Sequence, residues 1–557
     1  MATFSCACSS TSGDGAPGGA GGIAGTAGSS GSGGVAGSNA AGGQSGAMAS
    51  GGANAGGGGL GQAGNSEGGT ATGPATSPFD WVDVIGSGQS LSTGCGTPAV
   101  STTQPFQNLK LLDEGPDPKY PIDGSTSAQW SVIPLVEPIR EAITGYADGD
   151  YPNNICPGDG GYGETPHSGM ANALSALWAA RGQMGDYVTA HSVVGKGGAC
   201  LNAIDEMSRS FSAALSEARV FKTLADAAGK SYGVGGIIFT HGECDAVTGN
   251  TEYGAQLYEL WQAYNTEIKA ITGQTRDVVL FASQQSAFGG GAQGTAAQVW
   301  QASVDHPDQI VCTGPKYAFA PYGVHLSASG YERIGEKYGE AFDAVVNQGI
   351  AWKPVGPKKV ARAGAVITVD FYVPNPPLVW DTHLATPHQT LHTAWAEGRG
   401  FEVTDDAANE IAIASTEIQG DQVIITLDAA PADGTALTLG YGLTADADGG
   451  QWAGYDVGLH GLLRDSDEFV GVGPETIQVQ AQSGSTYLTE VTAGDFARRS
   501  SFDIVTGGDL PDDAIVASAG GNLMVLSTPW PGATGTAELT FRHDQHNYCV
   551  HFSMPIP

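Results

Sequence analysis

The stretch WVDVIGSGQSL, residues 81–91, joins a run of apolar residues to a glycine-rich turn that ends at a serine. The run is continuous enough to form a strand buried on both faces, which is typical of parallel sheets. Glycine before the serine permits a tight turn, so the Ser90 hydroxyl can project at the end of the strand beside backbone donors. We therefore predict Ser90 at the carboxyl end of a buried strand, while Gly/Ser turns after strands are also common without a catalytic role.

Three further apolar runs follow this stretch, each leading into helix-like sequence. They cover residues 187–195, 235–240 and 277–282. Residues 253–271 show apolar side chains at helical spacing, and another helix is expected from about Leu201. Strands that alternate with helices predict a three-layer α/β/α sandwich with a mostly parallel sheet. In such sheets, sites gather beyond the carboxyl ends of the strands.

A last helix of this part is expected after His325. Ser329 and Glu332 have the spacing of a capping box at its start. Apolar residues at helical spacing predict its buried stripe: Tyr331, Ile334, Tyr338 and Phe342.

After about residue 355 the helical periodicity gives way to short β-rich runs separated by Asp, Gly and Pro. The runs cover residues 366–373, 411–415, 422–427 and 436–442. Short strands at this spacing predict an all-β, sandwich-like part. The expected divisions are an α/β domain over 79–352, a β-sandwich-like domain over 353–470 and a β-rich region over 471–557. This last region is either a third domain or a continuation of the second.

Residues 9–78 consist mostly of Gly, Ala, Ser and Thr. Such a sequence cannot offset its ordering entropy by burial, so residues 1–78 are expected to form a disordered tether. Cys6 and Cys8 directly before it resemble the start of a mature bacterial lipoprotein. The sequence thus favours a secreted or cell-surface protein, with an outer-membrane lipid anchor at an N-terminal cysteine.

Charge and composition exclude several partner classes. The formal net charge of −34, from 57 acidic and 23 basic residues, repels nucleic acid and anionic lipid surfaces. No CxxC pair occurs among the cysteines of the folded part, which argues against zinc fingers and thioredoxin-like chemistry, and no cofactor is expected. Disulfides and buried free thiols both remain open for these cysteines.

Three more polar segments share the position of Ser90, after a predicted strand or before a helix. Gly197 and Gly198 free backbone N–H groups that can face an oxyanion, or they simply close a turn. His241 and Glu243 follow the strand at 235–240, either as site residues or in a solvated loop. His325 lies before the last helix, where a histidine is often structural.

Together, these segments resemble the SGNH/GDSL hydrolases, in particular the branch of sialate O-acetylesterases and acetylxylan esterases. The resemblance covers roughly residues 80–348. It implies a serine esterase that removes acyl groups, acetyl above all, from carbohydrate. Ser90 would be the nucleophile and His325 its base, as in triad logic. Gly197 or Gly198, with the Ser90 N–H, would hold the oxyanion.

Two positions depart from the pattern of that branch. His241 stands where the family usually has glutamine, and it is retained as a candidate oxyanion donor. Tyr322 stands where an aspartate usually precedes the histidine by three residues. By the same resemblance, Glu243 is the preferred residue to orient His325, with Asp245 as the fallback. The alternative is a surface carbohydrate-binding or adhesive protein on an inactive hydrolase scaffold.

The β-rich part carries clusters that could bind metal or sugar, but none has a full ligand set at a recognised spacing, so a structural role is preferred and no metal is predicted. The histidine and aspartate clusters are His383, His388 and His392, then His543 and His546, then Asp446 and Asp448. The tryptophans that could stack on sugar rings are Trp380, Trp395 and Trp452, with core packing expected for at least two of them.

Overall fold

The computed structural model describes residues 77–113, 130–139, 163–183, 187–289, 291–445, 459–469 and 474–557. Most of the predicted tether, including Cys6 and Cys8, lies outside these residues, as do Asp446, Asp448 and Trp452. None of the described helices is long and apolar enough to cross a membrane.

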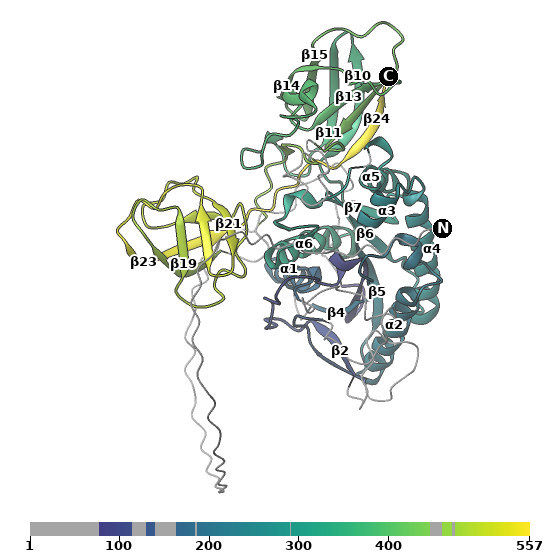
Figure 1. Cartoon of the computed structure of the whole chain (residues 1–557). Coiled ribbons are helices and arrows are strands. Elements are labelled where there is room, and N and C mark those ends of the chain that lie inside the picture. The colour runs from purple at the N-terminus through teal and green to yellow at the C-terminus, as the bar shows by residue number, and fades with distance from the viewer. Residues whose placement is uncertain are drawn as a thin grey trace, which may run out of the picture. The chain divides into compact units, whose positions relative to one another are not determined.

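A seven-stranded sheet forms the centre of the α/β part (Figure 1). Its strand order is β3-β2-β4-β1-β5-β6-β7, and all neighbours run parallel except β2 and β3. The strands are β1 (Trp81–Gly88), β2 (Leu109–Asp113), β3 (Trp130–Pro134), β4 (Val188–Val193), β5 (Tyr232–Thr240), β6 (Val279–Gln284) and β7 (Ile310–Pro315). The predicted mostly parallel α/β sheet is confirmed.

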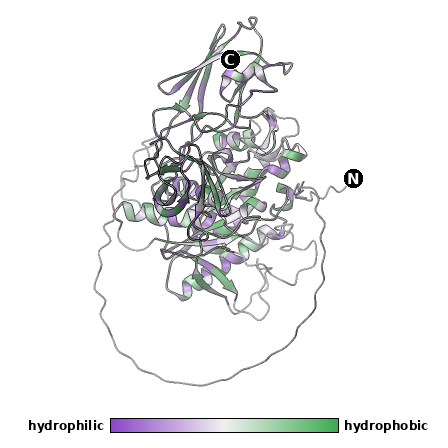
Figure 2. Ribbon diagram, turned by 60° about the vertical axis from the view of Figure 1, so that its left-hand side comes forward, coloured by the Kyte–Doolittle hydropathy of each residue, from purple (hydrophilic) through white to green (hydrophobic). Residues whose placement is uncertain are grey.

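The two faces of the sheet are covered by different helices. Val82 and Val84 of β1 belong to one apolar cluster with α1 (Pro166–Ala180) and α6 (Ala328–Phe342). Ile85 points the other way and belongs to a second cluster with α2 (Arg209–Ala227), α4 (Tyr253–Thr272) and α5 (Thr295–Asp305). Successive side chains of a strand face opposite sides, so one short run supplies both cores. The helices alternate hydrophilic and hydrophobic segments accordingly (Figure 2).

The chain order places β1 at the point where the sheet reverses its direction of growth. After β1, the chain forms β2, β3 and β4 on one side of it and then β5, β6 and β7 on the other. In such sheets, ligands bind beyond the carboxyl ends of the strands at this point, which here is the end of β1 between β4 and β5. Ser90 follows β1 directly, so it lies at this switch point.

Two predicted helix starts differ from the structure. Helix α6 is capped by Ser327, whose side chain accepts from the Gly330 N–H, while Ser329 lies inside the helix and its Oγ donates to the Arg499 carbonyl. Ser327 has the extended conformation that is typical of a cap, whereas Ser329 is already part of the helix. Residues Leu201–Ala203 form a single 3₁₀ turn, and α2 begins at Arg209 after the cap Ser208.

Antiparallel sheets follow the α/β part, as predicted. One has the order β10-β11-β15-β14 and another the order β13-β16-β24. Their strands are β10 (Gly356–Ala363), β11 (Val366–Tyr372), β13 (Phe401–Asp405), β14 (Ile413–Gln419), β15 (Gln422–Leu427), β16 (Leu437–Tyr441) and β24 (Phe552–Ile556). A short pair joins β12 (Val379–Trp380) to β17 (Leu463–Arg464).

One part of the region 471–557 forms a sheet of its own, and another part continues the preceding β part, so each of the two predicted alternatives holds for part of it. A six-stranded sheet of its own has the order β20-β23-β18-β19-β22-β21. Its strands are β18 (Glu475–Ala481), β19 (Tyr487–Glu490), β20 (Ile504–Thr506), β21 (Val516–Gly520), β22 (Leu523–Leu526) and β23 (Gly535–Arg542). The last strand, β24, instead returns to β16, so this six-stranded sheet is an insertion into the preceding β part.

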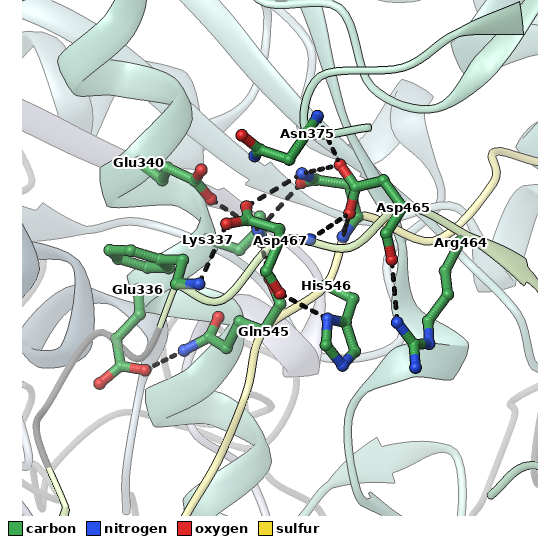
Figure 3. A network of polar contacts seen from close by, with 11 residues as sticks. Glu336, Lys337, Glu340, Asn375, Arg464, Asp465, Asp467, Gln545 and His546 are labelled. Carbon is green, nitrogen blue, oxygen red and sulfur yellow. Dashed lines mark hydrogen bonds and ion pairs between the residues drawn. The ribbon is translucent and has the colours of Figure 1, made fainter. Parts of the chain in front are cut away.

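Helix α6 is buried on its polar side as well as along the predicted apolar stripe. Lys337 Nζ donates to Glu340 Oε2 at 2.6 Å and to the Gln545 carbonyl at 3.0 Å, and it lies 3.8 Å from Asp467 Oδ2 (Figure 3). Glu336 accepts from the Gln545 side chain in the same network. Buried charges persist where they are paired and hydrogen-bonded. The network anchors the helix that begins three residues after His325.

Candidate active site

Ser90 and His325 meet at the carboxyl edge of the sheet. Ser90 Oγ lies 2.7 Å from His325 Nε2, a hydrogen bond between residues 235 positions apart. Ser90 is buried and begins a 3₁₀ turn (Ser90–Ser92), and His325 is half-buried on β9 (His325–Leu326). The pair has the geometry of a nucleophile and its base.

Gly88 allows the turn that presents Ser90. Its φ is +134°, and a Cβ at this position would lie 2.4 Å from the Thr240 carbonyl oxygen. The same carbonyl accepts from the Gln89 N–H at 3.3 Å, so the turn lies directly against the end of β5. The backbone N–H of Ser90 forms no hydrogen bond within the part of the chain that the structure describes. This donor remains available to an oxyanion.

The loop after β4 approaches the serine turn through a glycine that sequence reasoning missed. A Cβ on Gly195 would lie 1.9 Å from Ser92 Oγ, and the neighbouring Lys196 N–H donates to the Gly88 carbonyl at 2.9 Å. The predicted oxyanion glycines come next: Gly197 is half-buried and Gly198 is exposed, with φ +65°. Neither N–H donates to another described residue. The loop therefore reaches the turn, and an oxyanion role for these two glycines stays a prediction.

His241 is placed differently from its predicted role. Its Nε2 lies 2.9 Å from the Ala199 carbonyl and its Nδ1 lies 2.9 Å from the Tyr253 hydroxyl. A carbonyl only accepts, so Nε2 carries the proton and Nδ1 accepts from the tyrosine. Burial lowers the pKa of His241 to about 4, which keeps the ring neutral. Both ring nitrogens are thus engaged, and the side chain holds the loop at Ala199 instead of facing an oxyanion.

A disulfide joins the loops that follow β4 and β5. Cys200 and Cys244 are bonded, with their Cα atoms 4.9 Å apart. Cys244 lies next to Glu243 in the short helix α3 (Glu243–Thr248), and its N–H donates to Gln89 Oε1 at 3.4 Å. Cys312 and Cys549 are free and buried. Both possibilities left open for the cysteines therefore occur in the chain.

Glu243, the predicted partner of His325, contacts another residue. Its Oε1 accepts a hydrogen bond from Lys316 Nζ, and both side chains are at least 95% buried. No hydrogen bond joins Glu243 to His325 among the described residues, although both line one cavity. The fallback, Asp245, accepts from the Leu201 N–H at 2.8 Å and from Asn250 at 2.7 Å. The structure thus brings Ser90 and His325 together and leaves both carboxylates engaged elsewhere.

Lys316 is a site residue that sequence reasoning missed. It directly follows β7, as Glu243 and Ser90 follow shortly after β5 and β1. Its position directly after a buried strand is the feature of the sequence that could have predicted Lys316 as a site residue. Burial lowers the pKa of Lys316, whereas the contact with the Glu243 carboxylate favours its protonated form. Burial and the Lys316 charge together lower the pKa of His325 to about 4, so its imidazole is neutral at pH 7 and can accept a proton.

His325 is held by a small hairpin and by the helix after it. Strand β8 (Pro321–Tyr322) pairs with β9, and Tyr322 lies opposite His325 in the register. Ser327, the cap of α6, donates its N–H to the Ala320 carbonyl at 2.9 Å. Tyr322, three residues before the histidine in the chain, is therefore directly across the hairpin from it.

The histidine clusters of the β part have protein partners. His392 Nδ1 lies 2.6 Å from Glu410, and His543 Nδ1 lies 2.8 Å from Asp503. Within the described residues, no group of three or more His, Cys, Asp or Glu side chains is arranged to hold a metal ion. Trp395 is buried and donates to the Val403 carbonyl, whereas Trp380 is half-buried beneath the Arg399 guanidinium.

Three solved structures are similar to this chain in fold. A carbohydrate acetylesterase from Xanthomonas citri is 14% identical over 69% of this chain and 77% of its own, with a TM-score of 0.41. A protein from Arabidopsis thaliana is 13% identical over 48% and 100%, with a TM-score of 0.34. NanS is 11% identical over 48% and 98%, with a TM-score of 0.30. The sequence matches no family model and no curated protein.

Proposed function

We propose that this chain is a serine esterase that removes acyl groups, acetyl in particular, from carbohydrate. The observation that carries the proposal is the 2.7 Å contact between Ser90 Oγ and a neutral His325. A free serine hydroxyl is a weak nucleophile, and a neutral imidazole within hydrogen-bonding reach is what activates it. The resemblance of the residues around Ser90 and His325 to SGNH hydrolases supports the same chemistry.

In the proposed reaction, Ser90 Oγ attacks the ester carbonyl while His325 Nε2 takes the hydroxyl proton. The oxyanion is stabilised by the Ser90 N–H and by the N–H of Gly197 or Gly198. Collapse of the tetrahedral intermediate breaks the bond to the sugar oxygen, which leaves with the proton from His325. Water then attacks the acyl-enzyme while His325 takes its proton. The acyl C–O bond to Ser90 breaks, Ser90 Oγ takes the proton back from His325, and acetate is released.

The net charge of −34 supports neutral carbohydrate esters as substrates, because an anionic polymer is repelled. We also propose a secreted or cell-surface location, which the Cys200–Cys244 disulfide supports, since disulfides persist in oxidising compartments. The lipid anchor on an N-terminal cysteine remains part of this proposal.

The experiment that tests the activity is acetate release from a panel of acetylated glycans and from a chromogenic acetate ester. The purified wild type is expected to hydrolyse the chromogenic ester and at least one glycan, and Ser90→Ala is expected to hydrolyse neither. Unchanged acetate release from Ser90→Ala contradicts the catalytic assignment.

One observation favours a second candidate, a carbohydrate-binding protein without activity. No carboxylate contacts His325 within the described residues, so the usual stabilisation of an imidazolium is absent. Tight glycan binding by the wild type without any turnover of the chromogenic ester would support this candidate against the esterase.

A further inference from the structure

A small cavity adjoins the proposed catalytic histidine. Its volume is about 30 Å³, and His325 forms part of its wall. Most of the lining is apolar and comes from Leu91, Ala287, Phe319, Pro321 and Leu326. The charged groups in its wall are Glu243 and Lys316. An apolar cavity with a few converging polar groups is the usual form of a small-molecule subsite.

The ion pair leaves hydrogen-bonding capacity unused among the residues that line this cavity. Glu243 Oε1 accepts from Lys316, but Glu243 Oε2 is buried without a partner among the described residues. Lys316 Nζ carries three N–H donors and uses one of them on Glu243. A buried polar group without a partner destabilises the protein, more so when it is charged, so a ligand that supplies the missing hydrogen bond gains affinity from it.

The two charges define what such a ligand must be. The negative charge of Glu243 would repel a carboxylate or a phosphate. The positive charge of Lys316 would repel an ammonium group. A neutral hydroxyl suits both, because it donates to Glu243 Oε2 and accepts from Lys316 Nζ. One water-sized group needs roughly 10–15 Å³, so a cavity of about 30 Å³ has room for a hydroxyl.

We propose that the cavity walled by Glu243, Lys316 and His325 is a subsite for a free hydroxyl of a neutral sugar, next to the acylated position. This inference rests on the proposed esterase function. It narrows the substrate to esters of neutral sugars with an unsubstituted neighbouring hydroxyl. Because His325 forms both the wall of this cavity and the contact to Ser90, a hydroxyl bound there lies close to the reacting ester.

The test compares three acetate esters by kcat/KM. The first is a monoacetylated neutral pyranoside with a free neighbouring hydroxyl, the second is its deoxy analogue at that hydroxyl, and the third is 4-nitrophenyl acetate. The wild type is expected to prefer the first over the second by about 10- to 100-fold, the loss expected when buried polar groups stay unpaired. A ratio near one overturns the subsite.

A double variant tests whether the Glu243–Lys316 ion pair causes the preference for the ester with a free hydroxyl. Glu243→Met with Lys316→Met replaces both charges by apolar side chains of similar length and leaves no buried charge unpaired. The hydroxyl-to-deoxy ratio is expected to fall to about one, because the ratio within one enzyme cancels any change in the basicity of His325. The matched control, Lys222→Met with Asp226→Leu, removes an exposed pair on α2 and should keep the wild-type ratio.

The outcomes separate the subsite from the esterase function. If 4-nitrophenyl acetate is hydrolysed by the wild type and not by Ser90→Ala, while the ratio is near one, the function stands and the subsite is wrong. If the wild type hydrolyses none of the three esters, the function is wrong and the subsite with it. A preference that persists in the Glu243/Lys316 double variant overturns the subsite alone.

Discussion

Ser90 Oγ and His325 Nε2 lie 2.7 Å apart at the point where the central sheet reverses its direction of growth. Strand β1 brings the serine to that point, and the hairpin before α6 brings the histidine. The two side chains come from elements separated by most of the α/β part, so their contact requires the whole sheet to be assembled.

If this contact is catalytic, the two residues should act as one unit. Ser90→Ala and His325→Gln are each expected to lower kcat/KM for a chromogenic acetate by about 10³-fold or more, and the double variant should be no worse than Ser90→Ala alone. Steady-state kinetics on the three variants checks this. Ser212→Ala, an exposed serine on α2, serves as the control and should retain full activity. Multiplicative losses in the double variant would contradict a shared role.

The pH dependence should reflect the low pKa of His325. The base works as neutral imidazole, so kcat/KM falls as the pH drops through its pKa, and this acid limb is expected near pH 4 instead of near 6.5. Lys316→Met removes a positive charge, which raises the pKa of His325 and moves the limb to higher pH, although burial still holds it below 6.5.

The matched control for this shift is Lys230→Met, which removes an exposed lysine far along the chain from the site and should leave the acid limb in place. An acid limb that is the same in Lys316→Met and in the wild type would show that the Lys316 charge does not set the basicity of His325.

Gly88 should tolerate no side chain. Gly88→Ala introduces a Cβ 2.4 Å from the Thr240 oxygen at a φ of +134°, with an expected loss of about 2–4 kcal/mol in the free energy of unfolding and a loss of ester hydrolysis. Gly229 also has a positive φ, but it lies in the left-handed α region at +68° with open space around it, so Gly229→Ala should cost about 1 kcal/mol. Denaturant unfolding of both variants compares the costs, and equal costs would rule out the clash.

The disulfide between Cys200 and Cys244 should stabilise the site. It closes a loop with a sequence separation of 44, for which the chain-entropy relation gives about 4 kcal/mol. Replacing both cysteines by alanine is expected to lower Tm, and to lower kcat because the loops carrying Gly197 and Glu243 are no longer linked. Calorimetry together with acetate release measures both effects, and an unchanged Tm would contradict the stabilising role.

Much of the fold could be predicted from the sequence, because the evidence for it is local. Apolar runs such as 81–86 and 235–240 are continuous where both faces of a strand are buried, and helix 253–271 shows its stripe directly. The position of a polar residue just after such a run also has a local cause, since parallel strands all end at one edge of the sheet. This position predicts that Ser90 and Glu243 lie at that edge.

What the sequence by itself determined is therefore the type of sheet and the set of residues presented at its edge. The tertiary structure decided how those residues pair. Chain order differs from sheet order, so the neighbours of a side chain at that edge come from distant loops. Glu243 accepts a hydrogen bond from Lys316, and His241 is hydrogen-bonded to Ala199 and Tyr253. In the β part, β24 pairs with β16 although the six-stranded sheet lies between them in the sequence. Hydrogen bonds and ion pairs act over a few ångströms, and only the assembled sheet sets those distances.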